Sequence, residues 1–225
     1  MSTTSRTLVV TLLSTLGALV AGCGGGLSYK VDDGALDSVP AGERQGIFAA
    51  QNDLEVAKSE QRTAQSQLDS WDRERDIAKT EKEQAELEVD KASAQAEGAA
   101  QSRNENQAAQ AKHQKDVADF GVKVAEQKLS WLDDKKDWLK AARKAADAHV
   151  TAAQAKIEFE KAKVAQQKGI KPDSSFSVSN YEGQWKDANS DWESAKKDAA
   201  SEEKDAKGSE KKWQDLQAQK QKMGG

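Results

Sequence analysis

The sequence has very little cysteine, proline, histidine or aromatic residue. Its 225 residues include one cysteine, two prolines, two histidines and 5% aromatic side chains. A single cysteine excludes an intramolecular disulfide, and the scattered histidines have none of the spacings typical of a transition-metal site. With so little proline, long helices can run without interruption. We therefore expect no metal and no cofactor in this chain.

Recognisable catalytic patterns are missing as well. No glycine-rich phosphate loop follows a strand pattern, and no nucleophile elbow is present. Adjacent acids such as Asp133 and Asp134 point about 100° apart on a helix, so they do not form a catalytic pair. We expect that the chain is not an enzyme. Its 34 basic residues are outnumbered by 38 acidic ones, and this mildly acidic balance gives no basis for binding nucleic acid.

What the chain does contain is charge and alanine in a seven-residue repeat. Charged residues make up 32% of the sequence, a composition typical of either long helices or disorder. From Ile47 to Ala99, apolar residues recur at alternating spacings of three and four, interrupted only by Gln61, Arg75 and Lys82. This periodicity favours a coiled coil. Because most of the repeated residues are alanine, each heptad buries little area.

The stretch 103–168 carries two apolar lines instead of one. The first contains Leu132 and Leu139, and the second contains Trp131 and Trp138. At about 100° per residue the lines lie roughly 160° apart, so this helix is expected to pack between two neighbours. The sequence therefore predicts an all-α fold, an elongated antiparallel coiled-coil bundle in residues 43–223, with three long helices at about 43–97, 103–168 and 179–223.

Two interruptions separate these helices. Gly98 favours the end of the first helix, and Ser102 with Glu105 is typical of a capping box that starts the second. One uninterrupted helix over 43–168 is the alternative. The second interruption, 169–175, contains glycine and proline, and Ser179 with Glu182 is expected to cap the third helix.

Short connections make consecutive helices antiparallel. Two such turns bring four tryptophans to a similar height, namely Trp71, Trp131, Trp138 and Trp213. All six tryptophans lie on apolar lines, so we interpret them as packing residues and not as platforms for a glycan or a peptide.

Charged residues have two expected positions in this bundle. Lys161 is expected to be exposed. Five polar residues that interrupt the apolar lines are expected to reach solvent or to meet acids across the interface, namely Gln61, Arg75, Lys82, Lys136 and Arg143.

The N-terminus has the pattern of an export signal. Arg6 precedes an uncharged apolar run from Leu8 to Val20. About 13 apolar residues are too few to span a membrane and fit a signal peptide. The run Val20-Ala21-Gly22-Cys23 resembles the lipobox of bacterial lipoproteins, and this resemblance covers only the first 23 residues. It implies cleavage between Gly22 and Cys23, removal of residues 1–22 as signal peptide, and acyl chains such as palmitate on Cys23.

The same resemblance implies a cellular location. Lipidated Cys23 would anchor the protein in a membrane of the bacterial cell envelope. In an organism with two membranes, Gly24 after the cysteine implies the outer membrane, facing the periplasm. Residues 23–42 contain several glycines, Pro40 and no helical period, so they are expected to be a flexible tether.

Three functions are compatible with these features. The first is a coiled-coil scaffold or partner-docking rod, the second a periplasmic holdase-like chaperone, and the third an adaptor for an export channel. The chaperones and adaptors that the chain resembles in outline carry β-rich domains, and no strand pattern is present here, which favours the first. The candidate docking site for an envelope protein is the polar first turn, with Gln101, Ser102, Arg103, Asn104, Glu105, Asn106 and Gln107. A homo-oligomer through the remaining coiled-coil surface is also compatible.

Overall fold

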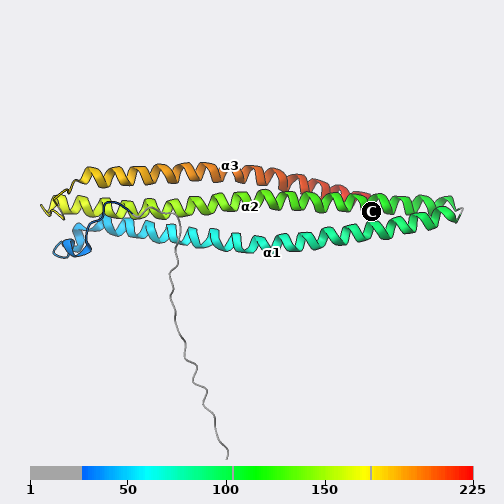
Figure 1. The fold of residues 1–225 in the computed structure, drawn as a ribbon, viewed down its shortest axis with the longest axis horizontal. Helices are drawn as coiled ribbons and strands as arrows, with labels where there is room; N and C mark the ends of the chain where they lie inside the picture. Colours follow the sequence, from blue (N-terminus) through cyan, green and yellow to red (C-terminus); the bar gives the residue numbers. More distant parts are fainter. Residues whose placement is uncertain (1–26, 103, 173, 225) are drawn as a thin grey trace, which may run out of the picture.

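The computed structural model describes residues 27–102, 104–172 and 174–224, and these residues form an all-α structure (Figure 1). No β-strand occurs in these three ranges. The long helices are α1 Gln45–Gln101, α2 Glu105–Gln167 and α3 Val178–Gly224. Two short 3-10 helices precede them, η1 Asp33–Leu36 and η2 Ala41–Glu43. The predicted bundle of three long antiparallel helices is confirmed.

The three long helices lie side by side in one layer. Helix α2 packs against α1 on one side and against α3 on the other, while α1 and α3 share no extended interface in the described part of the chain (Figure 1). The two apolar lines of α2 account for this arrangement, because each line faces one neighbour. At 1.5 Å per residue, the 63 residues of α2 make the rod about 95 Å long.

Strict heptads form the interface between α1 and α2. One residue in seven of α1 is buried, namely Ala50, Ala57, Ala64, Trp71, Ala78, Ala85, Ala92 and Ala99. The facing residues of α2 follow the same spacing, namely Ala111, Ala118, Ala125, Leu132, Leu139, Ala146 and Ala153. Alanine lets the two helices approach closely but buries little apolar area per turn. The stability of this interface therefore depends strongly on the few larger side chains.

Those larger side chains gather halfway along the rod. Trp71, Leu132 and Leu139 form one buried cluster, against which Trp131 and Trp138 pack. The indole Nε1 of Trp71 donates a hydrogen bond of 2.6 Å to the backbone oxygen of Leu132. The predicted contact between Trp71 and the neighbourhood of Trp131 and Trp138 is confirmed, which excludes one uninterrupted helix over 43–168.

Stacked rings join α2 to α3. Trp131 stacks on Trp213 with ring centroids 5.0 Å apart, and Phe159 stacks on Trp185 at 5.4 Å. Such offset pairs contribute about 0.5–1.5 kcal/mol beyond their buried area. The interpretation of the tryptophans as packing residues is confirmed.

The polar residues that interrupt the heptads meet partners, as expected. Three of them reach acids across the α1–α2 interface, Gln61 to Asp147 at 2.7 Å, Arg75 to Asp133 at 3.1 Å and Lys82 to Glu126 at 3.4 Å. Lys136 lies 4.0 Å from the centroid of the Trp71 ring, and Arg143 pairs with an acid of its own helix. Pairing at the interface edge lowers the cost of placing these charges there, although Arg143 Nε is buried without a hydrogen bond to any described residue and lies 3.5 Å from Asp147 Oδ2.

The first turn is shorter than the sequence predicts. Helix α1 continues past Gly98 to Gln101, and α2 is capped by Asn104, whose side chain accepts a hydrogen bond from the amide of Gln107 at 3.2 Å. The prediction of a Ser102–Glu105 capping box is therefore wrong. Burial of Ala99 against α2 continues the helix, and this outweighs the roughly 1 kcal/mol that an exposed glycine costs.

The second turn agrees with the prediction at the end of α2 but not at the start of α3. Helix α2 ends at Gln167, and Gly169 has a positive φ of 67°, while Ile170 donates its amide to the Ala165 carbonyl at 2.9 Å. This is the hydrogen-bond pattern of a glycine-terminated helix. Helix α3, however, starts at Val178. The prediction of Ser179 as its cap is therefore wrong, because that residue already lies in the first helical turn.

Residues 27–44, which we name the strap, contradict the prediction of a flexible tether. Val31, Leu36 and Val39 of the strap are each only 3% exposed and join the core formed by the N-terminal end of α1, the C-terminal end of α2 and Tyr181 of α3. Residues 27–42 are therefore folded onto the bundle. Residues 23–26 of the predicted tether lie outside the described residues. We name the end of the rod that carries the strap the base.

Candidate functional site

The polar turn between α1 and α2 forms the tip of the rod, at the end opposite the base (Figure 1). Gly224 at the end of α3 lies beside Val117 of α2, so α3 stops short of the tip. The first twelve or so residues of α2, about 18 Å of helix, pair with α1 alone. The tip is thus a two-helix hairpin that projects beyond the third helix.

All described members of the predicted docking site are exposed, namely Gln101, Ser102, Asn104, Glu105, Asn106 and Gln107, while Arg103 lies outside the described residues. They divide into two groups. Ser102 and Asn104 hold the turn, since Ser102 Oγ donates to the Ala99 carbonyl at 2.7 Å and Asn104 caps α2. In the described part of the chain, the side chains of Gln101, Glu105 and Asn106 make no hydrogen bond or ion pair, which leaves them available to a partner.

The predicted lipidation and cleavage residues, Cys23 and Gly22, lie outside the described residues. The described chain nearest to them is Leu27, where the strap begins. The strap therefore determines where a group attached to Cys23 joins the rod.

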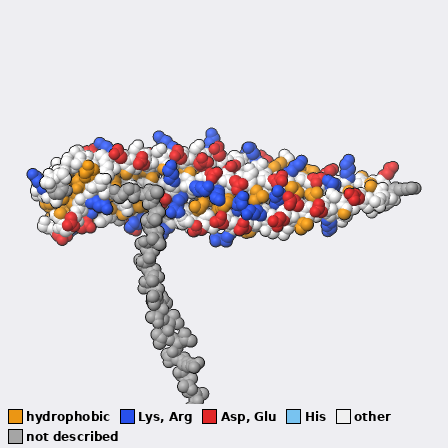
Figure 2. All heavy atoms as spheres, viewed as in Figure 1, with side chains coloured by type: hydrophobic (Ala, Val, Ile, Leu, Met, Phe, Trp, Pro, Cys, Tyr) orange, Lys and Arg blue, Asp and Glu red, His pale blue; other side chains and the backbone are white. Residues whose placement is uncertain are grey.

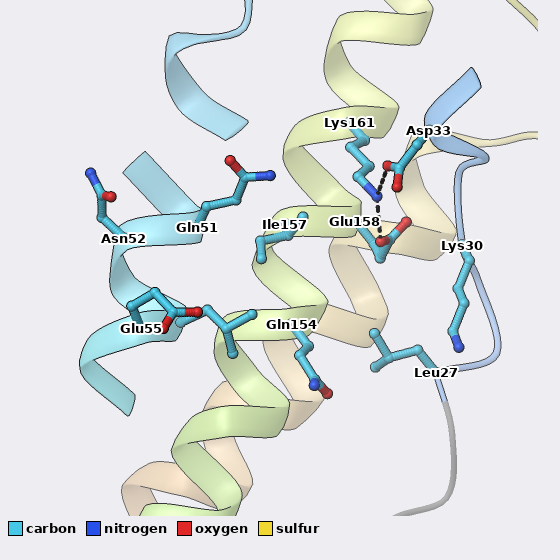
Figure 3. A pocket seen from close by; sticks show the side chains of 11 residues that line it. Leu27, Lys30, Asp33, Gln51, Asn52, Glu55, Gln154, Ile157, Glu158 and Lys161 are labelled. Carbon is cyan, nitrogen blue, oxygen red and sulfur yellow. Dashed lines mark hydrogen bonds and ion pairs between the residues drawn. The ribbon is translucent and has the colours of Figure 1, made fainter. Parts of the chain in front are cut away.

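A buried ion-pair cluster fastens the strap to α2 (Figure 3). Lys161 is only 9% exposed, and its Nζ lies 2.6 Å from Asp33 Oδ1 of the strap and 2.9 Å from Glu158 Oε1. The other oxygen of Glu158 accepts a hydrogen bond of 2.7 Å from the amide of Val31. The prediction that Lys161 is exposed is wrong, because the strap covers it.

Burial and ion pairing shift the pKa of Lys161 in opposite directions. Burial alone lowers the pKa of this ammonium group, but hydrogen bonds and attraction to Asp33 and Glu158 outweigh it, so the pKa of Lys161 is raised. The lysine is therefore charged at neutral pH, and the cluster holds the strap as a satisfied ionic network.

Contacts to α3 fasten the start of the strap. The amide of Tyr29 donates to Gln184 Oε1 at 2.9 Å, and Gln184 Nε2 donates back to the Tyr29 carbonyl at 3.1 Å. The rings of Tyr29 and Tyr181 lie 5.7 Å apart. Since Glu158 and Lys161 belong to α2, the strap crosses from α3 over α2 before the chain enters α1.

An open hollow of about 610 Å³ lies between the strap and α1 (Figure 3). Leu27, Leu54 and Ile157 give it apolar walls, and the amides of Gln51 and Gln154 border it. Lys161, Asp33 and Glu158 also border it, but these three residues satisfy one another. The hollow therefore presents apolar and amide surface together with the charged side chains of Lys30 and Glu55 beside the start of the strap.

His149 links all three helices, which the sequence patterns did not indicate. Its ring lies 4.0 Å from the Trp192 ring of α3 and nearly parallel to it, and Nδ1 lies 2.7 Å from a carboxylate oxygen of Glu60 on α1. The only sequence signal is its place on α2 within reach of both interfaces. His149 serves as a packing and hydrogen-bonding residue between the three helices.

In residues 27–102, 104–172 and 174–224, no group of three or more His, Cys, Asp or Glu side chains is placed to hold a metal ion. None of the helices in the same ranges is both long and apolar enough to cross a membrane. Comparison with protein-family models, with curated proteins and with solved structures finds no match to the chain. Functional inference therefore rests on the geometry of the rod and on the sequence of its N-terminus.

Proposed function

We propose that this chain is a lipid-anchored, non-enzymatic protein of the bacterial cell envelope that acts as a rigid rod for docking or spacing a protein partner. One observation carries the proposal. The strap, which continues toward Cys23, is fastened at the base, and the exposed polar tip lies at the opposite end (Figure 1). Helix α1 alone, with 57 residues, separates the two ends by about 85 Å. Such a shape suits a protein that holds a partner away from its own anchor.

The face of the rod seen in Figure 2 supports this function better than a chaperone function. Basic and acidic side chains alternate along the visible face, with only small apolar areas between them (Figure 2). A holdase needs apolar surface for unfolded clients. Suppression of client aggregation by the purified protein would favour the chaperone, whereas the rod function predicts no suppression. In an organism with two membranes, we place the anchor in the outer membrane with the rod facing the periplasm.

Replacing Cys23 with serine is expected to release the protein from the membrane. A serine hydroxyl cannot form the thioether that a lipidated cysteine carries, and the acyl chains supply the anchoring energy. The measurement is fractionation of cells expressing Cys23→Ser beside the unchanged chain, with mass spectrometry of the N-terminus. Unaltered processing and membrane association in Cys23→Ser would contradict the anchor.

Replacing Gln101 and Asn106 together with alanine is expected to abolish partner capture without changing the melting temperature. Both side chains are exposed and make no described contact, and such surface changes cost less than about 0.5 kcal/mol. The measurement is a pull-down from envelope extracts with the lipidated protein, beside thermal unfolding.

Asn104→Ala is the control for the stability measurement, because it changes a residue of the same tip that caps a helix. It removes the cap of α2, so it is expected to lower the free energy of unfolding by about 1 kcal/mol. Capture that persists in the Gln101→Ala, Asn106→Ala variant would place the docking surface along the helices instead of at the tip.

A further inference from the structure

The strap leaves the bundle sideways, before the rod reaches its base end. Leu27, the first described residue, borders the same hollow as Gln154 of α2 (Figure 3). From Gln154, α2 runs on to Gln167, which adds about 20 Å of helix at 1.5 Å per residue. The chain toward Cys23 therefore joins the rod about 20 Å from the base end.

The strap also marks one face of the rod. At 100° per residue, Gln154, Glu158 and Lys161 lie within about 60° of one another on α2, and two of them bind the strap. We name this side the strap face. Lys156 lies about 200° around the helix from Gln154 and pairs with Asp53 of α1. It therefore points to the opposite face, at nearly the same height along the rod.

Covalent geometry limits how far Cys23 can lie from the strap face. Three glycines lie between Cys23 and Leu27, which makes four Cα-to-Cα steps. Each step spans at most about 3.6 Å, so the reach is about 14 Å in any conformation. If the rod stood upright on its base end, Leu27 would lie about 20 Å above the membrane. The reach is too short for that orientation while the strap stays bound.

We propose that the strap face lies against the lipid surface that holds Cys23, so that the rod is tilted along the membrane instead of standing on its base. This inference rests on the proposed lipid anchor. The strap contacts enforce the tilt, because they keep residues 27–44 from adding to the reach. Exposed Lys30 and the amides of Gln51 and Gln154 can hydrogen-bond lipid headgroups. The strap also exposes Asp32, Asp33 and Asp37, so the inference rests on the short covalent reach and not on charge attraction.

Two single-cysteine labels test this orientation. Cys23 is the only cysteine and its sulfur is acylated under the proposal, so an introduced cysteine supplies the only free thiol. Gln154→Cys and Lys156→Cys are labelled with a fluorophore in the full lipidated chain, which is then placed in phosphatidylethanolamine–phosphatidylglycerol vesicles containing a nitroxide headgroup lipid. Quenching is expected to be several-fold stronger at position 154 than at position 156. Equal quenching, or stronger quenching at position 156, would overturn the proposal.

A longer connection provides the control. A Gly-Ser insertion of about twelve residues after Gly26 adds up to roughly 40 Å of reach and touches no described contact. The insertion is expected to abolish the difference in quenching between the two labels. If the difference persists, the short connection to Cys23 is not its cause. Flotation of the same samples separates the two proposals. Protein that fails to float with vesicles contradicts the lipid anchor, while floating protein with equally quenched labels contradicts only the orientation.

Discussion

Leu132→Ala is expected to lower the free energy of unfolding by about 2–4 kcal/mol, as other large-to-small changes in buried positions do. Leu132 and Leu139 are each 1% exposed and are the largest fully buried side chains in the described part of the chain. They pack against each other, Trp71 and Ala78, and the Trp71 indole is held by its hydrogen bond to the Leu132 carbonyl, so these neighbours are poorly placed to fill the space that a truncated leucine leaves. Leu139→Ala is expected to behave in the same way. Urea denaturation followed by circular dichroism measures the change.

Leu87→Ala is the matched control, since it makes the same chemical change on α1 at a side chain that is 67% exposed. Its expected cost is below about 0.5 kcal/mol. Equal destabilisation by Leu132→Ala and Leu87→Ala would contradict a core that depends on a few large residues. That result would show instead that stability is distributed evenly along the helices.

The arrangement of the long helices could be predicted because coiled-coil burial is periodic. Each α1 residue of the Ala50 heptad series is buried, and that spacing can be read without tertiary information. The two lines of α2 likewise require one neighbour on each side. Local periodicity and overall fold agree over most of this chain.

The strap could not be predicted by the same reasoning. Val31, Leu36 and Val39 are buried at spacings of five and three, which match neither a helical nor a strand period. Glycine and proline nearby are typical of flexible chain, yet here they belong to 3-10 turns, of which η1 packs against α2 and η2 against α1. Only the three-dimensional surface of the base explains why these valines and this leucine are buried.

The burial of Lys161 could not be predicted for a related reason. On a charge-rich helix, a lysine outside the apolar lines is usually solvated, and nothing local separates Lys161 from its neighbours. Its partner Asp33 belongs to the strap, 128 positions away in sequence. The cap of α2 at the tip could not be predicted locally either. Ser102 and Asn104 both have side chains that can cap a helix, and the continued burial of Ala99 decides that Asn104 is the cap.

The raised pKa of Lys161 gives the strap a dependence on pH. A group whose pKa is raised on folding contributes stability that is fully present below its unfolded value, which is about 10.4 for lysine. That contribution is lost as pH rises through the higher folded value. The strap is therefore expected to stay bound across neutral pH and to loosen in strongly alkaline solution.

Glu158→Ala is expected to release the strap while the three-helix bundle stays folded. The change leaves the buried ammonium of Lys161 with only Asp33, whose side chain is largely exposed, and removes the acceptor of the Val31 amide. Removing one partner of a buried ion pair costs about 3–5 kcal/mol. Hydrogen exchange of residues 27–44, read by mass spectrometry, is therefore expected to accelerate by more than about 100-fold.

Glu55→Ala is the control for this variant, because Glu55 borders the same hollow and its one ion pair among the described residues is with Lys58 on its own helix. An exposed pair of this kind contributes little to stability because solvent screens it, so strap exchange should stay unchanged. If Glu158→Ala also leaves exchange unchanged, the burial of Val31, Leu36 and Val39 and the contacts of Tyr29 to α3 hold the strap without the Lys161 cluster. Accelerated exchange in Glu158→Ala alone would instead identify the Lys161 cluster as the fastening that keeps the connection to Cys23 short.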